Sequence, residues 1–593
     1  MELFSLQYFL FISILLAAYF LLPRISRAAG RFQWVLLLAA SLGFYLFSGR
    51  EAILLMLTTA FTVWGGGLLL SGRDAAYQKQ KKAGFSSSAE RKTAKKKIAS
   101  EKRVILACVL LLNFGILAWL KYFPALIPAF SGLLLPLGIS FYTFQAISYL
   151  IDQYNGKYPA ERNFLHFFLF VSWFPQLLQG PIGRYDKLRP QFFRENHWDS
   201  DRTKRALLLI LFGLMKKYAI ADMLVGSISS VLDGDISRLP GSLVVFAILL
   251  YSAQQYADFS GGIDIISGVS LLFGIELAPN FRQPYFSTSL GDFWRRWHIS
   301  LGAWMRDYLF YPFALLKPMQ KFGKWCTKHM GKNGKHFGRV LPAGIANLVV
   351  FFVVGIWHGP QLHYVLWGLY NGMVIALSDL TEPFWKNLAA KLRMNTGSRG
   401  FHVFRIVRTF VIVNIGWYFD RISQLRNCLQ AFAVTLTDFR LTALKDGIVS
   451  EIIGHSTLFN IAGGYAVAFL GLILVFADSI QKERGCDVCG QIIHGRFVRK
   501  MLIVILMMLL VIASFLFTES AGGFLYANFC FRNIQEAEPR FCKTHILFPA
   551  EHLRSAEKPL SSGLSVPSER SSLLSDGALS WPFGRNVAKL PQL

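Results

Sequence analysis

Apolar residues along this chain are gathered into long blocks that are separated by short polar connectors. A helix needs roughly 20 mostly apolar residues to cross the hydrocarbon core of a bilayer. Only helices and closed β-barrels can span a bilayer, and the blocks lack the alternating pattern of a membrane β-strand, so helices are expected. The blocks cover about residues 3–22, 33–48, 52–71, 104–122, 126–151, 164–182, 205–225, 241–273, 340–357, 362–380, 403–420, 457–478 and 500–518. The pattern therefore predicts an all-α, polytopic transmembrane helical bundle, with about 11–13 spans if some blocks are re-entrant or interfacial.

Composition supports this prediction and excludes a set of soluble domains. Hydrophobic residues make up 53% of the chain and charged residues 16%, and the mean hydropathy is +0.40. Soluble domains are usually about 25% charged. The first apolar block, about residues 3–22, has neither a positive segment before it nor a small-residue cleavage site after it. We therefore expect this block to be a retained span and not a signal peptide.

The basic residues, which give a net charge of +27, cluster in the connectors. Such clustering is typical of the cytoplasmic loops of a protein that spans a lipid bilayer. It places the connectors at about 72–103 and 314–339 in the cytosol, together with Arg24, Arg27 and Arg31, and the N-terminus outside. We expect residues 73–103 to be a helical or solvated connector without a specific role. Nucleic-acid binding is not expected, because the basic connectors lack interleaved aromatic residues that stack on bases.

The chain changes character near its end. Residues 1–529 read as one transmembrane domain. The rest, 530–593, is predicted to be a disordered tail, because residues 555–593 are rich in Ser, Pro and charge. The seven cysteines are scattered, and those at 326, 486 and 489 lie in or near basic connectors, where a reducing cytosol disfavours disulfides. Cys486, Cys489 and His494 form only half of a zinc pattern, so no metal site is expected.

One histidine lies at the end of an apolar run. Residues 348–357 are apolar and lead into His358, with Gly355 before it and Gly359 after it. A helix that begins near Arg339 would carry His358 roughly 25–30 Å along its axis, within or across the membrane. An ionisable side chain there is either functional or a core histidine with satisfied nitrogens. Imidazole is suited to general acid–base catalysis near neutral pH, and the two glycines would leave room for a substrate.

A second segment, residues 291–312, is too polar for a lipid-facing span and too aromatic for a loop. It reads either as a helix at the membrane surface, with its aromatic rings at headgroup level, or as the wall of a polar cavity. In the second interpretation, Arg295, Arg296 and Arg306 are available to hold an anionic donor. Residues 136–145 and 175–185 place Gln, Ser, Thr, Gly and Pro inside apolar blocks, which favours either a helix break that lines a cavity or packing between helices.

These four segments together resemble the membrane-bound O-acyltransferase (MBOAT) family. The runs at 293–301 and 355–359 look like its signature pair, and the form is similar to the bacterial branch of alginate O-acetylation and D-alanyl-lipoteichoic acid transfer proteins. The resemblance extends over about residues 1–529 and implies a ring of tilted helices around a central funnel or tunnel. It implies that His358 is catalytic and that His298 is a second active-site residue. Candidates for donor or substrate binding are Arg295, Arg296, Trp297, Arg306, Gln179 and Trp357.

The resemblance implies a multi-pass enzyme of the bacterial plasma membrane. It would move an acetyl group from a cytosolic thioester, acetyl-CoA or an acyl carrier protein, to an extracytoplasmic polysaccharide or a transferase partner, without a bound cofactor. D-alanyl transfer to teichoic acid is the alternative within enzymes. A transporter would predict paired broken helices in two related halves, which are not evident. An export-complex scaffold would predict that His358 is dispensable.

Overall fold

The computed structural model describes residues 5–48, 52–127, 136, 138–177, 179–448, 452 and 458–517. Helices dominate these residues, and the sole strand-like pairing among them is an isolated antiparallel bridge between Phe281 and Trp297. The predicted all-α class is therefore confirmed. The predicted tail, 530–593, lies outside the described residues.

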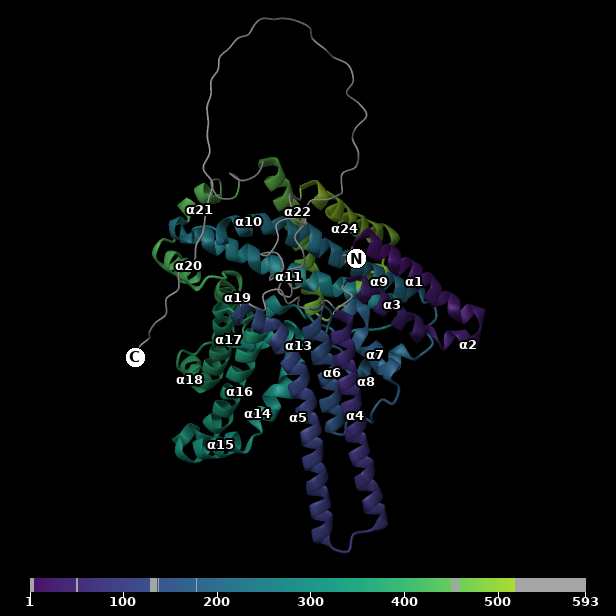
Figure 1. Ribbon diagram of the computed structural model, residues 1–593. Coiled ribbons are helices and arrows are strands. Elements are labelled where there is room, and N and C mark those ends of the chain that lie inside the picture. The colour runs from purple at the N-terminus through teal and green to yellow at the C-terminus, as the bar shows by residue number, and fades with distance from the viewer. Residues whose placement is uncertain are drawn as a thin grey trace, which may run out of the picture. The chain divides into compact units, whose positions relative to one another are not determined.

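The helices follow one another along the chain with few long connections (Figure 1). They are α1 (Leu6–Ile25), α2 (Arg27–Gly30), α3 (Gln33–Ser48), α4 (Ala52–Ala83), α5 (Ser88–Leu126), α6 (Ile139–Tyr154), α7 (Phe164–Ser172), α8 (Tyr185–Phe192), α9 (Ser200–Leu214), α10 (Met223–Leu232), α11 (Gly241–Leu272), α12 (Leu290–Arg296), α13 (Ile299–Met305), α14 (Tyr311–Ala314), α15 (Lys317–His329), α16 (Gly334–His358), α17 (Leu362–Leu380), α18 (Glu382–Lys391), α19 (Arg399–Arg421), α20 (Leu425–Thr437), α21 (Thr442–Gly447), α22 (Leu458–Glu483), α23 (Val488–Ile493) and α24 (Phe497–Phe517). Two π-helical turns, η3 (Met215–Asp222) and η6 (Arg306–Phe310), continue α9 and α13.

Seven helices in the described ranges are long and apolar enough to cross a membrane, which makes this a multi-pass membrane protein. They cover Leu6–Ile25, Ala28–Phe47, Ile53–Ala83, Ser88–Pro124, Gly331–His358, Asn460–Glu483 and Phe497–Phe517. The expected number of about 11–13 was larger, because the blocks at 126–151, 164–182, 205–225, 241–273, 362–380 and 403–420 were also counted as spans. Among these, α11 and α19 bury polar side chains such as Gln254, Asp258 and Asp420 inside the protein, which lowers their apolar content.

One predicted span is wrong as a continuous helix. The block at 164–182 gives only the nine residues of α7, which are too few to cross a bilayer. The chain leaves the helix at Trp173, and a 3-10 turn, η2 (Phe174–Gln176), follows. Pro175 explains the break, because proline lacks an amide hydrogen and restricts the residue before it.

Both basic connectors contain helices. Helix α4 continues to Ala83 and α5 begins at Ser88, so the segment at 72–103 is a hairpin of two helix ends that extends away from the other labelled helices (Figure 1). Ion pairs join the two helices near the base of this hairpin, with Lys102 Nζ 2.8 Å from Asp74. The segment at 314–339 contains α15, which packs against α16 where a Cβ at Gly323 would lie 2.6 Å from the Gly338 carbonyl oxygen.

A buried network of charges joins η3 and α11. The π-helical turn carries two consecutive lysines, Lys216 and Lys217, each only 3% exposed. Lys216 Nζ lies 2.6 Å from Asp264, and Lys217 Nζ lies 2.9 Å from Asp222 and 2.8 Å from Asp258. Each lysine therefore has a carboxylate partner inside the helical bundle, which is what a buried charge requires.

Candidate active site

His358 is positioned by a close crossing of α16 and α17. A Cβ at Gly355 would lie 2.5 Å from the Tyr364 carbonyl oxygen, and one at Gly368 would lie 2.2 Å from the Phe351 carbonyl oxygen. A Cβ at Gly359 would lie 2.8 Å from the Tyr364 ring. The expectation that Gly355 and Gly359 leave room for a substrate is therefore wrong, because they let the chain and α17 approach each other.

Helix α5 fixes the end of α16. Lys121 Nζ donates to the Trp357 carbonyl oxygen, and Tyr122 Oη donates to the Ile356 carbonyl oxygen at 2.9 Å. Carbonyls in the last turn of a helix have no partner within it, and a cation there also interacts favourably with the helix dipole. Sequence reasoning missed Lys121 and Tyr122. Their signal was a basic and an aromatic residue at the end of an otherwise apolar block.

His298 occupies a sharp break between α12 and α13. Its backbone is left-handed, with φ 47° and ψ 52°, a conformation that few residues other than glycine adopt and that often marks functional sites. Asn280 supports this break. The Asn280 carbonyl oxygen accepts from Ile299 N at 3.0 Å, and its Oδ1 accepts from Ser300 N at 3.0 Å and Ser300 Oγ at 2.9 Å.

The same contacts define which nitrogen of His298 carries its hydrogen. Asn280 Oδ1 must be the amide oxygen, because the Ser300 N–H can only donate to it. His298 Nδ1 lies 3.2 Å from this oxygen, so Nδ1 donates and Nε2 carries the lone pair. Burial lowers the pKa of the His298 imidazole to about 3, so the ring is neutral at physiological pH. His298 thus presents an unprotonated Nε2, whose lone pair can accept a hydrogen bond.

Aromatic rings connect the two histidines. The Trp357 ring centroid lies 6.3 Å from that of His298 and 5.1 Å from that of His358. Trp367 packs edge-on against His358 at 5.0 Å, and Phe259 packs edge-on against His298 at 4.9 Å. The structure therefore brings together the two histidines that the sequence singled out.

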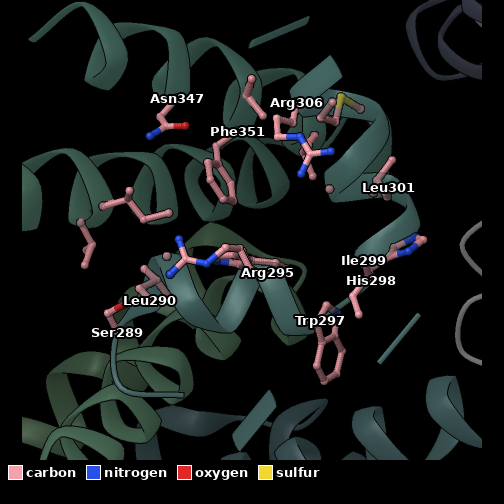
Figure 2. A pocket seen from close by; sticks show the side chains of 18 of the residues that line it. Ser289, Leu290, Arg295, Trp297, His298, Ile299, Leu301, Arg306, Asn347 and Phe351 are labelled. Atoms are coloured by element: carbon pink, nitrogen blue, oxygen red, sulfur yellow. The ribbon is translucent and has the colours of Figure 1, made fainter. Parts of the chain in front are cut away.

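Both histidines line a cavity of about 1110 Å³ between α12, α13, α16, α17 and α19. Along α16 its wall extends from Asn347 to His358, which corresponds to about 16 Å of helix. Figure 2 shows Arg295 and Arg306 reaching into this space from opposite sides, with His298 at one edge of the view. The side chains of Arg295 and Arg306 are 71% and 57% exposed, so these cations lie at an open part of the cavity.

The other predicted binding residues divide into two groups. Trp297 lines the cavity together with Arg295 and Arg306, whereas Arg296, Trp357 and Gln179 are not among its lining residues. Arg296 forms ion pairs with Asp292 at 3.2 Å and Glu483 at 2.9 Å.

Trp357 and Gln179 are buried among other side chains in the described structure. The Trp357 ring stacks on Phe144 with centroids 6.0 Å apart. Gln179 is 1% exposed and fills the space beside Gly262, where a Cβ would lie 2.4 Å from Gln179 Oε1.

The remaining two motifs brace the break at His298. Ser300 Oγ accepts from Ile182 N at 3.0 Å, and Gln145 Oε1 accepts from Gly183 N at 3.1 Å. Trp304 donates its indole N–H to the Phe144 carbonyl oxygen at 2.9 Å. These hydrogen bonds hold the loop around Ile182 and Gly183 against α13. The segments at 136–145, 175–185 and 291–312 therefore share one hydrogen-bonded network.

Comparison with known proteins shows that part of this chain is similar to a known family. Residues 159–327 match the family model described as MBOAT, membrane-bound O-acyltransferase family. This stretch, less than a third of the chain, is similar to members of that family. The matched MBOAT residues include Asn280, His298 and the cationic side chains Arg295 and Arg306, whereas His358 follows the matched stretch.

Curated relatives extend the likeness beyond the MBOAT residues. The chain is 32% identical over 364 residues to the probable alginate O-acetylase AlgI of Pseudomonas syringae pv. tomato, which covers 60% of this chain and 62% of the relative. It is 30% identical to the peptidoglycan O-acetyltransferase of Helicobacter pylori, over 56% of this chain and 64% of the relative. It is 28% identical to the teichoic acid D-alanyltransferase of Bacillus subtilis, over 48% of this chain and 67% of the relative. The chain thus spans less than two thirds of the alginate and peptidoglycan relatives.

Proposed function

We propose that this protein is a membrane-embedded O-acyltransferase that moves an acetyl group from a cytosolic thioester across the membrane for O-acetylation of an extracytoplasmic polysaccharide. The observation that carries the proposal is the cavity that joins His298 and His358 to exposed arginines. Relatives named for O-acetylation of alginate and peptidoglycan, over more than half of this chain, support it.

The two imidazoles can supply the acid–base chemistry. In the proposed step, a histidine accepts the proton of the acceptor hydroxyl while the hydroxyl oxygen attacks the thioester carbonyl carbon. A new C–O bond forms and the C–S bond breaks, and the proton passes from the histidine to the departing thiolate. We assign the catalytic base to His358. We place His298 Nε2, whose lone pair Asn280 defines, next to the reacting groups.

The exposed arginines fit an anionic donor. Arg295 and Arg306 offer planar guanidinium groups, which bind phosphates well. The donor is acetyl-CoA or an acyl carrier protein, used as a co-substrate, and the reaction needs no bound cofactor. By the positive-inside rule, the basic hairpin at 72–103 and helix α15 face the cytosol. Acyl thioester donors are made in that compartment. The enzyme acts in a bacterial plasma membrane, and a transferase partner or the polysaccharide itself receives the acyl group.

Transfer of D-alanine to teichoic acid is the second candidate, because the Bacillus subtilis relative is named for that activity. Deleting the gene and complementing it decides between the two. We expect mild base to release less acetate from the envelope of the deletion strain, with D-alanine unchanged, and complementation to restore the acetate. Mass analysis of the released acids measures this. A selective loss of D-alanine would establish the second candidate, and no ester change would contradict both.

A substitution at Asn280 tests the proposed arrangement of His298. Asn280→Leu removes the acceptor for Nδ1–H and for Ser300, and we expect it to lower the acyl-transfer rate by about 100-fold or more. Asn280→Asp keeps an acceptor but adds a carboxylate, which raises the pKa of His298, so the acidic limb of the pH–rate profile should move to higher pH. Asn395→Leu, at an exposed turn, is the matched control. A normal rate in the Asn280→Leu enzyme would contradict this role.

A further inference from the structure

A second cavity, of about 240 Å³, lies between α9, α22, α23 and α24. None of its described lining residues belongs to the cavity that contains the two histidines. Its wall is mostly apolar and includes Leu209 and Phe212 of α9, Leu474 of α22, and Ile503 and Met507 of α24. The proposed acyl-transfer step makes no use of this space.

Two cationic side chains line this second cavity at the ends of neighbouring helices. Lys482 lies in the last turn of α22 and Arg499 in the first turn of α24, two helices that are each apolar enough to span the membrane and that pack against each other. Leu474 precedes Lys482 by eight residues and Met507 follows Arg499 by eight, so each apolar side chain lies about 12 Å along its helix from the cation. The cavity therefore has cations at one end and apolar side chains at the other.

The charged groups of the cavity leave one positive charge unbalanced. They are Asp478, Lys482 and Arg499, one carboxylate against two cations. Lys482 Nζ lies 2.9 Å from Asp478 and 5.6 Å from the centroid of the Phe212 ring, which holds it at the cavity wall. Arg499 is exposed, and no ion pair within the described ranges includes it. The cation without a carboxylate partner is thus the one at the start of α24.

The surrounding connector indicates the side of the membrane. Residues 482–500 contain five Lys or Arg residues and two acidic residues, which places this connector in the cytosol by the positive-inside rule. Lys482 and Arg499 then lie where the phosphates of the cytoplasmic leaflet lie, at the ends of two spans. The apolar wall extends from that level into the hydrocarbon core.

We infer that this cavity binds one anionic phospholipid of the cytoplasmic leaflet. The phosphate would contact Arg499, whose planar guanidinium suits phosphate oxygens, with Lys482 beside it. The upper part of an acyl chain would lie along Leu474, Ile503 and Met507. Basic pockets between membrane helices on the cytoplasmic side are suited to anionic headgroups. A zwitterionic lipid carries its own cation and would gain less from the unbalanced charge.

The bound lipid would join helices that otherwise share little buried surface. Of the 21 residues of α24, only Met507, Leu510 and Ser514 are buried, so most of this helix faces the surroundings of the protein. A lipid in the cavity contacts α9, α22 and α24 together. Because it binds only the folded arrangement of these helices, it should raise the melting temperature.

The test uses the purified full chain, delipidated in detergent, and native mass spectrometry with phosphatidylglycerol and phosphatidylcholine that carry the same acyl chains. We expect the natural protein to bind phosphatidylglycerol at least about fivefold more tightly, as one unbalanced cation near the headgroup implies. Arg499→Gln should bring this preference to within about twofold. Phosphatidylglycerol should also raise the melting temperature of the natural protein more than that of the variant.

Two further pairs of variants separate the cavity from its surroundings. Arg484→Gln removes the same charge from the same connector, but Arg484 does not line the cavity, so this variant should keep the lipid preference. Ile503→Trp fills the apolar part of the cavity and should weaken phosphatidylglycerol binding. Leu502→Trp, at a side chain of the same helix that is 63% exposed, should not.

Four results would overturn the inference. The first is equal binding of the two lipids by the natural protein, and the second is an unchanged preference in Arg499→Gln or an equal loss in Arg484→Gln. The third is a rise in melting temperature with sn-glycerol 3-phosphate as large as that with phosphatidylglycerol, which would indicate a site for small anions. The fourth is a dimer that excludes lipid, which would assign the cavity to a second copy of the chain. None of these measurements depends on acyl transfer.

Discussion

Replacement of His358 by alanine should abolish acyl transfer, with a rate at least about 1000-fold lower, while the protein still inserts into the membrane. His358 ends α16 and lines the cavity, and its ring packs against the rings of Tyr364 and Trp367. The loss of one half-buried ring removes the proposed base but leaves the α16–α17 crossing intact. Base-released acetate per cell measures transfer, and an immunoblot of membranes measures insertion.

His329 provides the matched control for this substitution. It lies on the surface of α15, where Nδ1 is 2.9 Å from the Trp325 carbonyl oxygen, and His329→Ala should leave acetylation at the natural level. Full acetylation in the His358→Ala strain would exclude the proposed catalysis. It would favour the scaffold class of function, in which this histidine is dispensable.

Gly368→Val should prevent stable folding, because the crossing of α16 and α17 has no room for a side chain. A Cβ at Gly368 would lie 2.2 Å from the Phe351 carbonyl oxygen and 3.3 Å from the Gly355 Cα. Backbone atoms cannot rotate away as a side chain can, so the helices must separate. We expect a loss of about 3 kcal/mol or more in the free energy of unfolding, at the upper end for overpacking. The melting temperature in detergent and the amount of protein in membranes measure this.

Gly65 provides the control, because it is a helix glycine with free space around its Cα. It lies in α4, and a Cβ there would meet nothing within 4 Å. Gly65→Val should therefore leave the melting temperature within a few degrees of the natural protein. Equal melting temperatures for the Gly368 and Gly65 variants would show that the close approach of α16 and α17 is not needed for stability.

The sequence predicted the features that depend on residues close together in the chain. Long apolar runs predicted the all-α membrane architecture, and the runs around His298 and His358 indicated the site, because each motif is local. The partners of these motifs are distant in sequence. Lys121 is separated from Trp357 by 236 residues, and Asn280 from His298 by 18, so only the fold brings them together.

Two errors in the sequence-based expectations have a common physical cause. The block at 164–182 is apolar throughout most of its length, but hydropathy does not register the break that Pro175 imposes. Gly355 and Gly359 suggested open space, whereas the absence of a side chain allows α17 to fill that space. In the first case, the backbone geometry imposed by Pro175 determined where the helix ends. In the second case, the neighbouring helix α17 determined whether the space beside the glycines is empty.

The paired lysines in η3 constrain how the protein is made. Each lysine at the centre of a helix costs about 2.5–3.5 kcal/mol when that helix enters a bilayer during synthesis, so Lys216 and Lys217 together oppose entry by about 5–7 kcal/mol. Their carboxylate partners Asp258 and Asp264 belong to α11, which follows after a short connection. Neither segment is among the seven described helices that are apolar enough to cross a membrane alone, so α9 to α10 should remain at the insertion machinery until α11 has been synthesised, and the two should enter the lipid as a neutralised pair.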